Sequence, residues 1–221
     1  GILENTPRFD YSGGASCPSL LLEPSRTNRA EQSEYFDTYW DKAFSTITLN
    51  NDTPFQNGNS YTLTCDGTTG TFKGLKRSWI NASANTYSLS VFAKSGTSNT
   101  FIVSSRATLT SNNTYASFNL SNGTINSVDG GTALIEPYSN GWYRCTFVVV
   151  NTGTYTDYAS MLFGHPHNAA NGSSVLVTGA QSEIGSYPTS YIPTYGVSQT
   201  RAGELCSNLS LTTSTDFTIF F

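Results

Sequence analysis

A series of short segments with alternating side chains constrains the fold more than any other feature of the sequence. In residues 87–96, for example, Leu89, Val91 and Ala93 fall on one side of an extended chain. An alternation with a period of two is typical of a β-strand that buries one face. Gly, Asn, Asp or Pro residues, which favour turns, bound these segments. The segments are residues 44–50, 60–66, 71–80, 87–96, 100–105, 115–125, 141–150, 158–164 and 173–181.

This number of strands, without a strong helical pattern, predicts an all-β chain. Charged residues make up 12% of the sequence, about half of the usual ~25%. Ser, Thr, Asn, Gly and Tyr take their place, and such a composition suits strands joined by turns. We therefore predict an antiparallel β-sandwich of the jelly-roll type. Residues 28–40 could hold one or two helical turns, although we expect no aromatic stripe along them.

The pattern divides the chain into three regions. Residues 1–28 have no clean period and contain three prolines, so we predict an extended lead-in with one short strand. Residues 29–195 form the predicted jelly-roll domain. Residues 196–221 finish a strap and begin a further β segment or domain. Alternatively, the last strand docks back on the sandwich as an edge.

Composition and spacing also exclude several classes of function. The net charge of −4 gives no basic surface for nucleic acid, and no run of ~20 apolar residues suggests insertion in a membrane. The four cysteines match no zinc pattern. We expect buried free thiols, although two disulfides are arithmetically possible: Cys17, Cys65, Cys145 and Cys206. We expect His165 and His167 at a polar loop tip rather than on a metal ion.

Three stretches together resemble a family of bacteriophage tail and virion-appendage proteins. They are "PRFDYSGGASCPSLLLEPSRTN" (7–28), "NGWYRCTFVVV" (140–150) and "GAQSEIGSYPTSYIPTYGVSQTRAGE" (179–204). One departure from the family pattern is Ser182, where the usual residue is Leu. The resemblance implies a domain similar to a carbohydrate-binding jelly roll, located in the virion. It also implies host surface glycans and other virion proteins as partners. Appendage proteins of this kind are often homo-oligomers, although nothing in the sequence sets a copy number.

The stretch that follows the last strand of the domain is predicted to be a stiff strap. Its two prolines fix φ and favour extended residues before them. Its tyrosines offer flat area to lie along the domain, and its isoleucine can fill a pocket beneath. An ordinary ordered tail is the alternative. The predicted strap residues are Tyr187, Pro188, Tyr191, Ile192 and Pro193, followed by Tyr195.

Sugar recognition is the chemistry that best suits an aromatic-rich chain with little charge. A pyranose ring needs a flat aromatic platform together with fixed polar groups. Trp79 with Arg77 is the first candidate pair, and the alternative is that Leu75 and Trp79 face the core. Phe92 with Lys94 is the second pair, predicted to be exposed or in a groove because it lies opposite an apolar face. The remaining tryptophans are predicted to be structural: Trp40 and Trp142.

The motifs of enzymatic chemistry are missing from the sequence. It contains no G-x-S-x-G, no H-E-x-x-H and no Gly-rich phosphate loop. We therefore expect no catalytic residues, no cofactor and no metal site, and we hold an enzyme acting on polysaccharide as the weakest hypothesis. Similar jelly-roll modules often carry a structural calcium, so a calcium site is kept as an alternative. The acidic residues that could supply its oxygen ligands are Glu31, Glu34, Asp37 and Asp41. The predicted function is a non-catalytic carbohydrate-binding-like module. The alternative is a purely structural virion module without a ligand.

Overall fold

The computed structural model describes residues 9–10, 19–67, 72–79, 84–106, 114–151 and 159–205. The chain divides into two compact units, one of residues 26–201 and one of residues 1–25 with 202–221. In the smaller unit, β1 (Phe9–Asp10) pairs antiparallel with β2 (Ser19–Leu20), and the backbone N–H of Glu204 donates to the carbonyl of Glu23 at 2.9 Å. The strand pair expected after residue 205, Cys17 and Cys206 lie outside the described residues.

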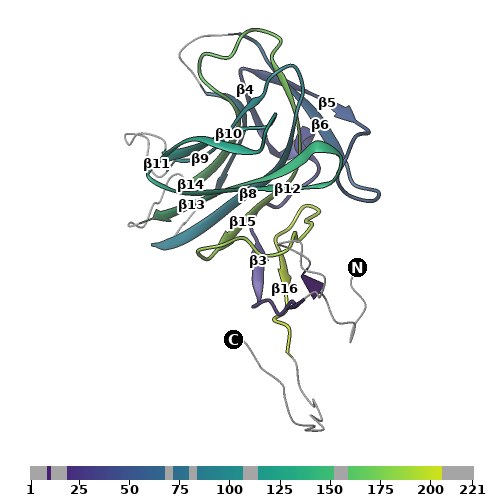
Figure 1. Cartoon of the computed structure of the whole chain (residues 1–221), viewed down its shortest axis with the longest axis vertical. Helices are drawn as coiled ribbons and strands as arrows, with labels where there is room; N and C mark the ends of the chain where they lie inside the picture. Colours follow the sequence, from purple (N-terminus) through teal and green to yellow (C-terminus); the bar gives the residue numbers. More distant parts are fainter. Residues whose placement is uncertain are drawn as a thin grey trace. The chain divides into compact units, whose positions relative to one another are not determined.

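The larger unit is an antiparallel β-sandwich of the jelly-roll type, as predicted. Two sheets form its layers (Figure 1). In the first sheet the spatial order is β11 (Thr124–Asp129), β10 (Thr114–Asn119), β9 (Thr100–Arg106), β14 (Ala159–His165), β7 (Lys73–Trp79) and β4 (Asp41–Ala43). In the second sheet it is β12 (Gly131–Pro137), β13 (Trp142–Asn151), β8 (Asn85–Ser95), β15 (Ser174–Ile184), β6 (Ser60–Cys65) and β5 (Ser45–Asn50).

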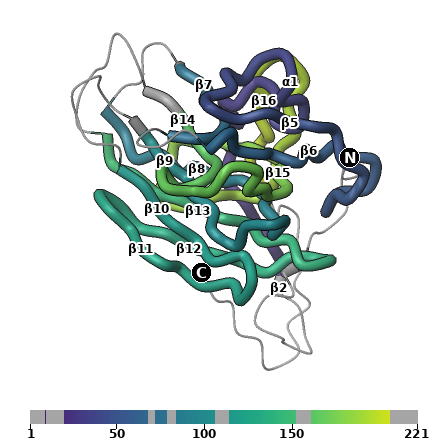
Figure 2. The backbone as a smooth tube through the Cα atoms, turned by 90° about the horizontal axis from the view of Figure 1, so that it is seen from above, coloured from purple at the N-terminus to yellow at the C-terminus, as the bar shows by residue number. Residues whose placement is uncertain are grey.

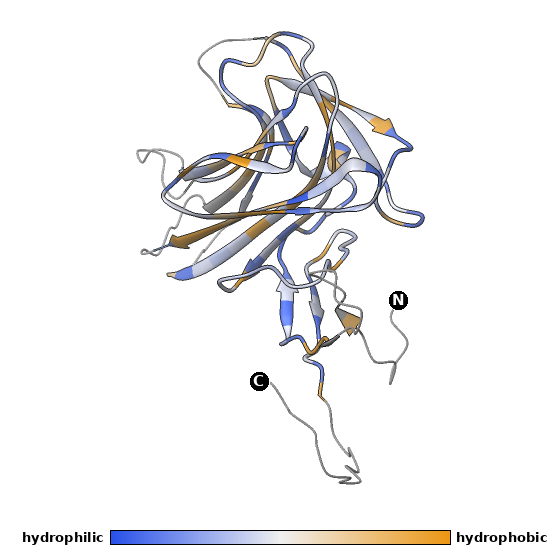
Figure 3. Cartoon of the chain, in the orientation of Figure 1, coloured by the Kyte–Doolittle hydropathy of each residue, from blue (hydrophilic) through white to orange (hydrophobic). Residues whose placement is uncertain are grey.

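The core lies between the two sheets, where residues from the central strands of each sheet point inward. The prediction that Leu89, Val91 and Ala93 share the buried face of β8 is confirmed. Figure 3 shows the hydrophobic stretches within the strands of the sandwich, as burial of one face per strand requires. Other fully buried members of the core are Leu63, Leu75, Phe101, Phe118, Phe147, Phe163 and Val177.

The structure splits one predicted strand and adds another. Residues 115–125 divide into β10 and β11, and the turn between them contains Gly123 with φ 68°. A Cβ on Gly123 would lie 2.6 Å from the ring of Tyr143, so a glycine is required there. β12 was not predicted, because its residues are mostly exposed and carry no strong alternation. Figure 2 shows β11 and β12 side by side, with one strand belonging to each sheet.

A single helical turn, α1 (Phe36–Tyr39), lies within residues 28–40. Phe36 and Trp40 are buried in the core, whereas Tyr35 and Tyr39 are exposed. Tyr35 and Trp40 flank the helix with non-helical backbone angles. The segment therefore carries one buried and one exposed pair of rings around a single turn, rather than an aromatic stripe along a helix.

The chain enters and leaves the larger unit through a two-stranded stem. β3 (Arg26–Asn28) pairs antiparallel with β16 (Gln199–Arg201), from Asn28 opposite Gln199 to Arg26 opposite Arg201. Figure 1 shows the two strands side by side. Segments more than 150 residues apart in sequence therefore meet at one end of the unit, and buried polar side chains hold them there.

Asn28 is the central residue of this arrangement. Its side chain is fully buried, and its Nδ2 donates to the carbonyls of Ala180 at 3.2 Å and Ile192 at 2.8 Å. Its Oδ1 accepts from the backbone N–H groups of Ala30 at 3.0 Å and Ser182 at 3.1 Å. Two donors and two acceptor lone pairs are the full capacity of an Asn side chain. One side chain thus joins the lead-in, β15 and the strap.

Five more buried polar residues complete the connection, and we call the group with Asn28 the clasp. Gln181 Oε1 accepts from the N–H of Ile192 at 2.7 Å, and Glu183 Oε2 accepts from the N–H of Thr189 at 2.9 Å. Ser33 Oγ accepts from the N–H of Thr194 at 2.8 Å. These bonds fix residues 189–194 against β15 and against the segment of residues 28–33. The clasp consists of Asn28, Ser33, Gln181, Glu183, Thr189 and Thr194.

The predicted strap residues take different positions along this stretch. Ile192 is buried, and Tyr191 is half-buried with its hydroxyl donating to Glu34 Oε1 at 2.9 Å. Tyr187 is exposed beneath the guanidinium of Arg26, 5.4 Å from the ring centroid. Pro188 is half-buried and Pro193 is exposed. The stretch is therefore held mainly by side-chain and backbone hydrogen bonds, with Ile192 as its apolar anchor.

Replacing Asn28 by Ala is expected to destabilise the protein strongly. The change leaves two buried carbonyls and two buried N–H groups without partners, so the free energy of unfolding should fall by about 3 kcal/mol or more. Urea denaturation followed by circular dichroism measures it. The matched control is Thr27→Ala, which removes a solvent-facing bond to Thr200 and should cost less than about 1 kcal/mol. Equal losses in the two variants would contradict the role given to Asn28.

Candidate functional site

Phe92 and Lys94 lie on the outer face of β8, opposite the core residues Val91 and Ala93, as predicted. The expectation that Phe92 is exposed is wrong, because its ring is only 2% accessible. Loops distant in sequence cover this part of the outer face. The structure therefore places Phe92 at the centre of a second, smaller apolar cluster outside the sandwich core.

Three further rings surround Phe92, and we call the four together the outer aromatic cluster: Phe55, Phe92, Tyr138 and Tyr191. The ring centroids of Phe55, Tyr138 and Tyr191 lie 4.8, 5.1 and 5.8 Å from that of Phe92, in edge-to-face geometry. Phe55 and Tyr191 stack face to face at 4.6 Å with an interplanar angle of 4°. Such pairs contribute about 0.5–1.5 kcal/mol each beyond burial. The cluster thus fastens the loop around residue 55 and the strap to the second sheet.

Gly179 makes room for this cluster. It lies in a bulge of β15 between Thr178 and Gln181 and has φ 62°. A Cβ at this position would stand 2.7 Å from the ring of Phe92 and 2.9 Å from that of Phe55, closer than atoms can approach. Gly179, the first residue of the 179–204 motif, is therefore explained by two aromatic rings that pack directly against its backbone and leave no room for a side chain.

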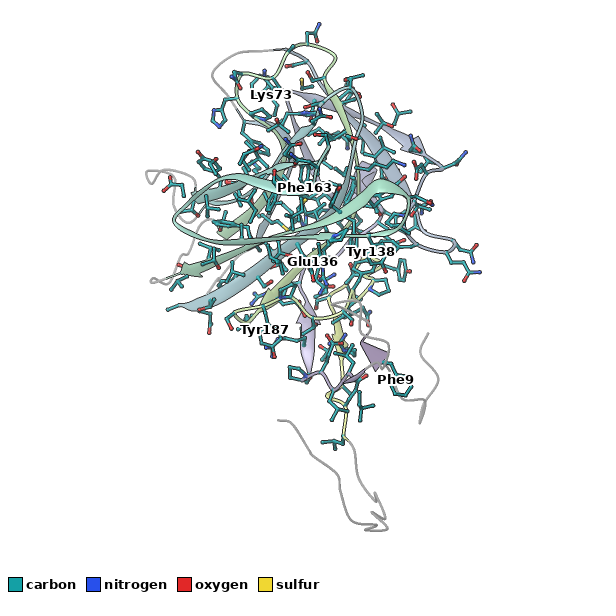
Figure 4. The ribbon with its side chains drawn as sticks, viewed as in Figure 1. Phe9, Lys73, Glu136, Tyr138, Phe163 and Tyr187 are labelled. Carbon is teal, nitrogen blue, oxygen red and sulfur yellow. The ribbon has the colours of Figure 1, made fainter. Side chains whose placement is uncertain are left out.

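Tyr138 is the most accessible ring of the cluster. It is 49% exposed, whereas Phe55 and Tyr191 are half-buried. It directly follows β12, next to the turn Ser139–Gly141, and Figure 4 shows it near the end of that strand with Glu136. An exposed tyrosine that rests edge-on against a buried phenylalanine offers one flat, rigid surface to a ligand.

Paired charges border the cluster on one side. Lys94 Nζ donates to Asp52 Oδ2 at 2.6 Å, and Trp142 Nε1–H donates to Asp52 Oδ1 at 3.0 Å. These two hydrogen bonds lower the pKa of Asp52 below its ordinary value. Trp142 is buried, which confirms its predicted structural role. Lys94 is therefore a fixed, part-exposed partner of a carboxylate rather than an open cation.

Arg144, from the segment "GWYR", borders the cluster on another side. Its guanidinium lies 5.6 Å from the ring centroid of Phe92, and Nε and Nη2 both donate to Ser90 Oγ, at 3.3 and 3.1 Å. In the pairing of β13 with β12, Arg144 lies opposite the exposed Glu136. Sequence reasoning missed Arg144, Tyr138 and Phe55. The available signals were the turn after Tyr138 and a lone aromatic within the polar loop that holds Phe55.

The other predicted pair lies on β7, in the first sheet. Leu75 is fully buried in the core, Lys73 is buried with Nζ donating to the carbonyl of Ala169 at 2.7 Å, and Arg77 is part-exposed. The burial of Leu75 agrees with one half of the alternative, in which Leu75 and Trp79 face the core, and the half that concerns Trp79 stays a prediction. Arg77 Nη2 donates to Glu31 Oε2 at 2.6 Å. Trp79 ends the strand, and its side chain lies outside the described residues.

His165 corrects a sequence expectation. It is the last residue of β14 and is fully buried, with Nε2 3.1 Å from the carbonyl oxygen of Leu63. The loop tip contains the exposed His167 instead. The strand continues further than the Pro and Gly residues nearby suggested. Desolvation lowers the pKa of His165, and the charge of Lys73 adds to the effect.

The remaining polar candidates do not gather around an ion. Within the described ranges, no group of three or more His, Cys, Asp or Glu residues could hold a metal. Glu31 pairs with Arg77, Asp41 lies 3.8 Å from Lys76, and Glu34 accepts from Tyr191. The described cysteines, Cys65 and Cys145, are buried free thiols, and burial raises the pKa of Cys145. None of the helices in the described part is long and apolar enough to span a membrane.

Comparison with known proteins gives likenesses of fold. No protein-family model matches the sequence, and no curated protein matches it. A tailspike protein 4 domain of bacteriophage CBA120 is similar over 71% of this chain, with 14% identity and a TM-score of 0.45; this chain spans 21% of that one. A xylan-binding domain of carbohydrate-binding module family 22 is similar over 73% of this chain and 98% of its own, with 13% identity and a TM-score of 0.46.

A family 11 carbohydrate-binding module from a cellulosomal cellulase of Clostridium thermocellum is a further likeness. It covers 75% of this chain and 98% of its own, with 12% identity and a TM-score of 0.39. TM-scores below 0.5 at this identity are too low for an inference of family or function. The function proposed below therefore depends on the residues of the site.

The stability of the protein should depend on pH through His165. In the unfolded chain this histidine takes up a proton near pH 6.5, whereas burial holds its folded-state pKa lower. As the pH falls from 7 to 5 the unfolded state binds more protons, so the free energy of unfolding should decrease. His165→Gln should flatten this dependence and His167→Gln should retain it, as measured by urea denaturation at each pH. The same slope in all three proteins would contradict the assignment.

Proposed function

We propose that this chain is a non-catalytic carbohydrate-binding-like module of a phage tail or other virion appendage that contacts host surface glycans. The observation that carries the proposal is the outer aromatic cluster, with the half-exposed Tyr138 held against the buried Phe92 and bordered by fixed charged groups. An aromatic platform with polar groups at its rim is what a sugar ring requires.

Each part of this surface has a role in the proposed contact. The ring of Tyr138 stacks on the C–H face of a sugar, while Asp52 and Arg144 exchange hydrogen bonds with hydroxyl groups at its edge. Lys94 and Trp142 hold Asp52 in place, so little side-chain entropy is lost when a ligand binds. Phe92 supports the platform from below. Arg77 and Trp79 on β7 are proposed as part of a second contact.

The proposed virion location is supported by the sequence motifs of the lead-in, the "GWYR" segment and the strap, which resemble those of phage appendage proteins. Host polysaccharide and other virion proteins are the proposed partners. A surface with a single exposed platform binds weakly, and many copies on one particle supply avidity. We therefore propose a homo-oligomer or a repeated arrangement in the appendage.

One observation favours the alternative, a structural virion module without a ligand. Phe92 is covered and Lys94 is already paired with a carboxylate, and the cluster fastens a loop and the strap to the second sheet. In this alternative the same rings serve stability alone. The two functions predict different effects of removing the exposed ring of Tyr138. The first predicts a loss of glycan binding, whereas the alternative predicts a change in stability alone.

Replacing Tyr138 by Ala is expected to weaken glycan binding about tenfold, which corresponds to ~1.4 kcal/mol. The reason is the loss of the stacking platform. The matched control is Tyr187→Ala, since Tyr187 is also 49% exposed but is not part of the cluster. A glycan array identifies the ligand, and titration calorimetry compares the variants. If the folded protein bound nothing on the array, the structural alternative would replace this proposal.

A further inference from the structure

Three tyrosines form a second exposed aromatic surface, which we call the tyrosine patch: Tyr35, Tyr39 and Tyr195. They are 40%, 43% and 60% exposed. The rings of Tyr35 and Tyr195 meet edge-to-face with centroids 6.1 Å apart. Tyr39, the last residue of α1, is joined to them through Arg77, which lies over its ring and binds Glu31, the residue that accepts from the N–H of Gly196 beside Tyr195. Figure 2 shows α1 next to the yellow chain near the end of the strap.

The backbone beneath the patch is firmly held, so its rings are rigid although they are exposed. Gln32 pairs with Tyr195 as an isolated β-bridge, and the N–H of Gly196 donates to the carbonyl of Glu31 at 2.7 Å. Trp40, buried in the core, donates from Nε1 to the carbonyl of Gln32 at 2.8 Å. Aromatic side chains on a fixed backbone lose little entropy when a ligand binds.

A fixed ion pair borders the patch. The guanidinium of Arg77 lies 5.6 Å from the ring centroid of Tyr39, and its Nη1 donates to the carbonyl of Tyr39 at 3.1 Å. Its Nη2 donates to Glu31 Oε2 at 2.6 Å, and both side chains are part-exposed. The pair therefore presents a donor and an acceptor in a set geometry at the rim of flat rings.

The size of the patch favours a small occupant. Three tyrosines exposed to this degree offer on the order of 300 Å² of surface. A stable protein–protein interface uses roughly 800 Å² on each partner, which is far more than the patch provides. One or two sugar rings match its extent, and its mixture of rings and paired charges suits their C–H faces and hydroxyl groups.

The charge around the patch selects among sugars. The positive charge of Arg77 is neutralised by Glu31, while Asp37 and Asp41 are exposed nearby on the same stretch of chain. Desolvation raises the pKa of Tyr195, and the nearby carboxylate of Glu34 raises it further. The positive charges near the patch are matched by carboxylates: Arg77 by Glu31, Lys76 by Asp41, and Lys42, which donates to the carbonyl of Asp37, by the exposed Asp37 side chain. An anionic sugar would therefore meet no excess of positive charge, so electrostatics favours an uncharged one.

We propose that the tyrosine patch is a second glycan-contact surface of this module, distinct from the outer aromatic cluster and selective for uncharged saccharides. The proposal goes beyond the function assigned to the Tyr138 surface, and the two can fail separately. Arg77, singled out from the sequence, is its fixed donor, while the aromatic platform is supplied by tyrosines that the sequence analysis did not assign to sugar binding.

The test uses the full chain and the variants Tyr39→Ala, Tyr195→Ala and the double variant, in both the parent and the Tyr138→Ala background. Each is screened on an array of uncharged and uronate-containing glycans, and the best uncharged oligosaccharide is then titrated. We expect Tyr138→Ala to retain residual binding that the double variant lowers at least fivefold. Tyr195→Trp, which enlarges the platform without disturbing α1, should keep or tighten binding. Tyr187→Ala is the control.

Three results would overturn the proposal. One is that the double variant binds as tightly as its parent while the Tyr138→Ala variant does not, which would leave the first surface standing alone. Another is a preference of the patch for uronate-containing glycans. A third is a change of oligomeric state in the double variant by analytical ultracentrifugation, with glycan binding intact, because it would make the patch a protein contact. A parent protein that binds no glycan would overturn both proposals.

Discussion

The side chain of Asn28 is the interaction on which the rest of the structure depends. Its four hydrogen bonds reach the lead-in, the bulged part of β15 and the strap. All of its partners are buried backbone groups, and only Gln carries the same donors and acceptor, on a side chain that is one methylene longer. The other members of the clasp act in the same way, because their hydrogen bonds join segments that are not paired as neighbouring strands in either sheet. The distinctive polar residues of the 179–204 motif are explained by this internal bonding.

The clasp also determines where both proposed contact surfaces lie. Tyr191 stacks on Phe55 in the outer aromatic cluster, while its hydroxyl reaches Ser33 and Glu34 beside the tyrosine patch. Tyr195, four residues further along the strap, belongs to that patch. Surface rings that would otherwise be mobile are thus attached to a rigid scaffold. The hydrogen bonds that stabilise the fold through the clasp therefore also position the two proposed binding surfaces.

Much of this fold could be predicted from the sequence, because alternation reports directly on the buried face of a strand. β8 illustrates the success, with Leu89, Val91 and Ala93 in the core. The same rule failed for Phe92, since the outer face of a strand is covered by residues that sequence spacing cannot connect: Phe55, Tyr138 and Tyr191. His165 failed for a related reason, because its burial depends on β6 rather than on its own neighbours. The burial of Phe36 and Trp40 could not be predicted either, because a helix of one turn is too short to leave a periodic pattern in the sequence.

The stem has a mechanical consequence. Since β3 and β16 run antiparallel and adjacent, tension between the two ends of residues 26–201 does not pass through the sandwich first. The force acts first on the three residue pairs of the stem, which separate one after another, and then on the hydrogen bonds of the clasp. A chain pulled at both ends would therefore open its stem before any load reached the two sheets.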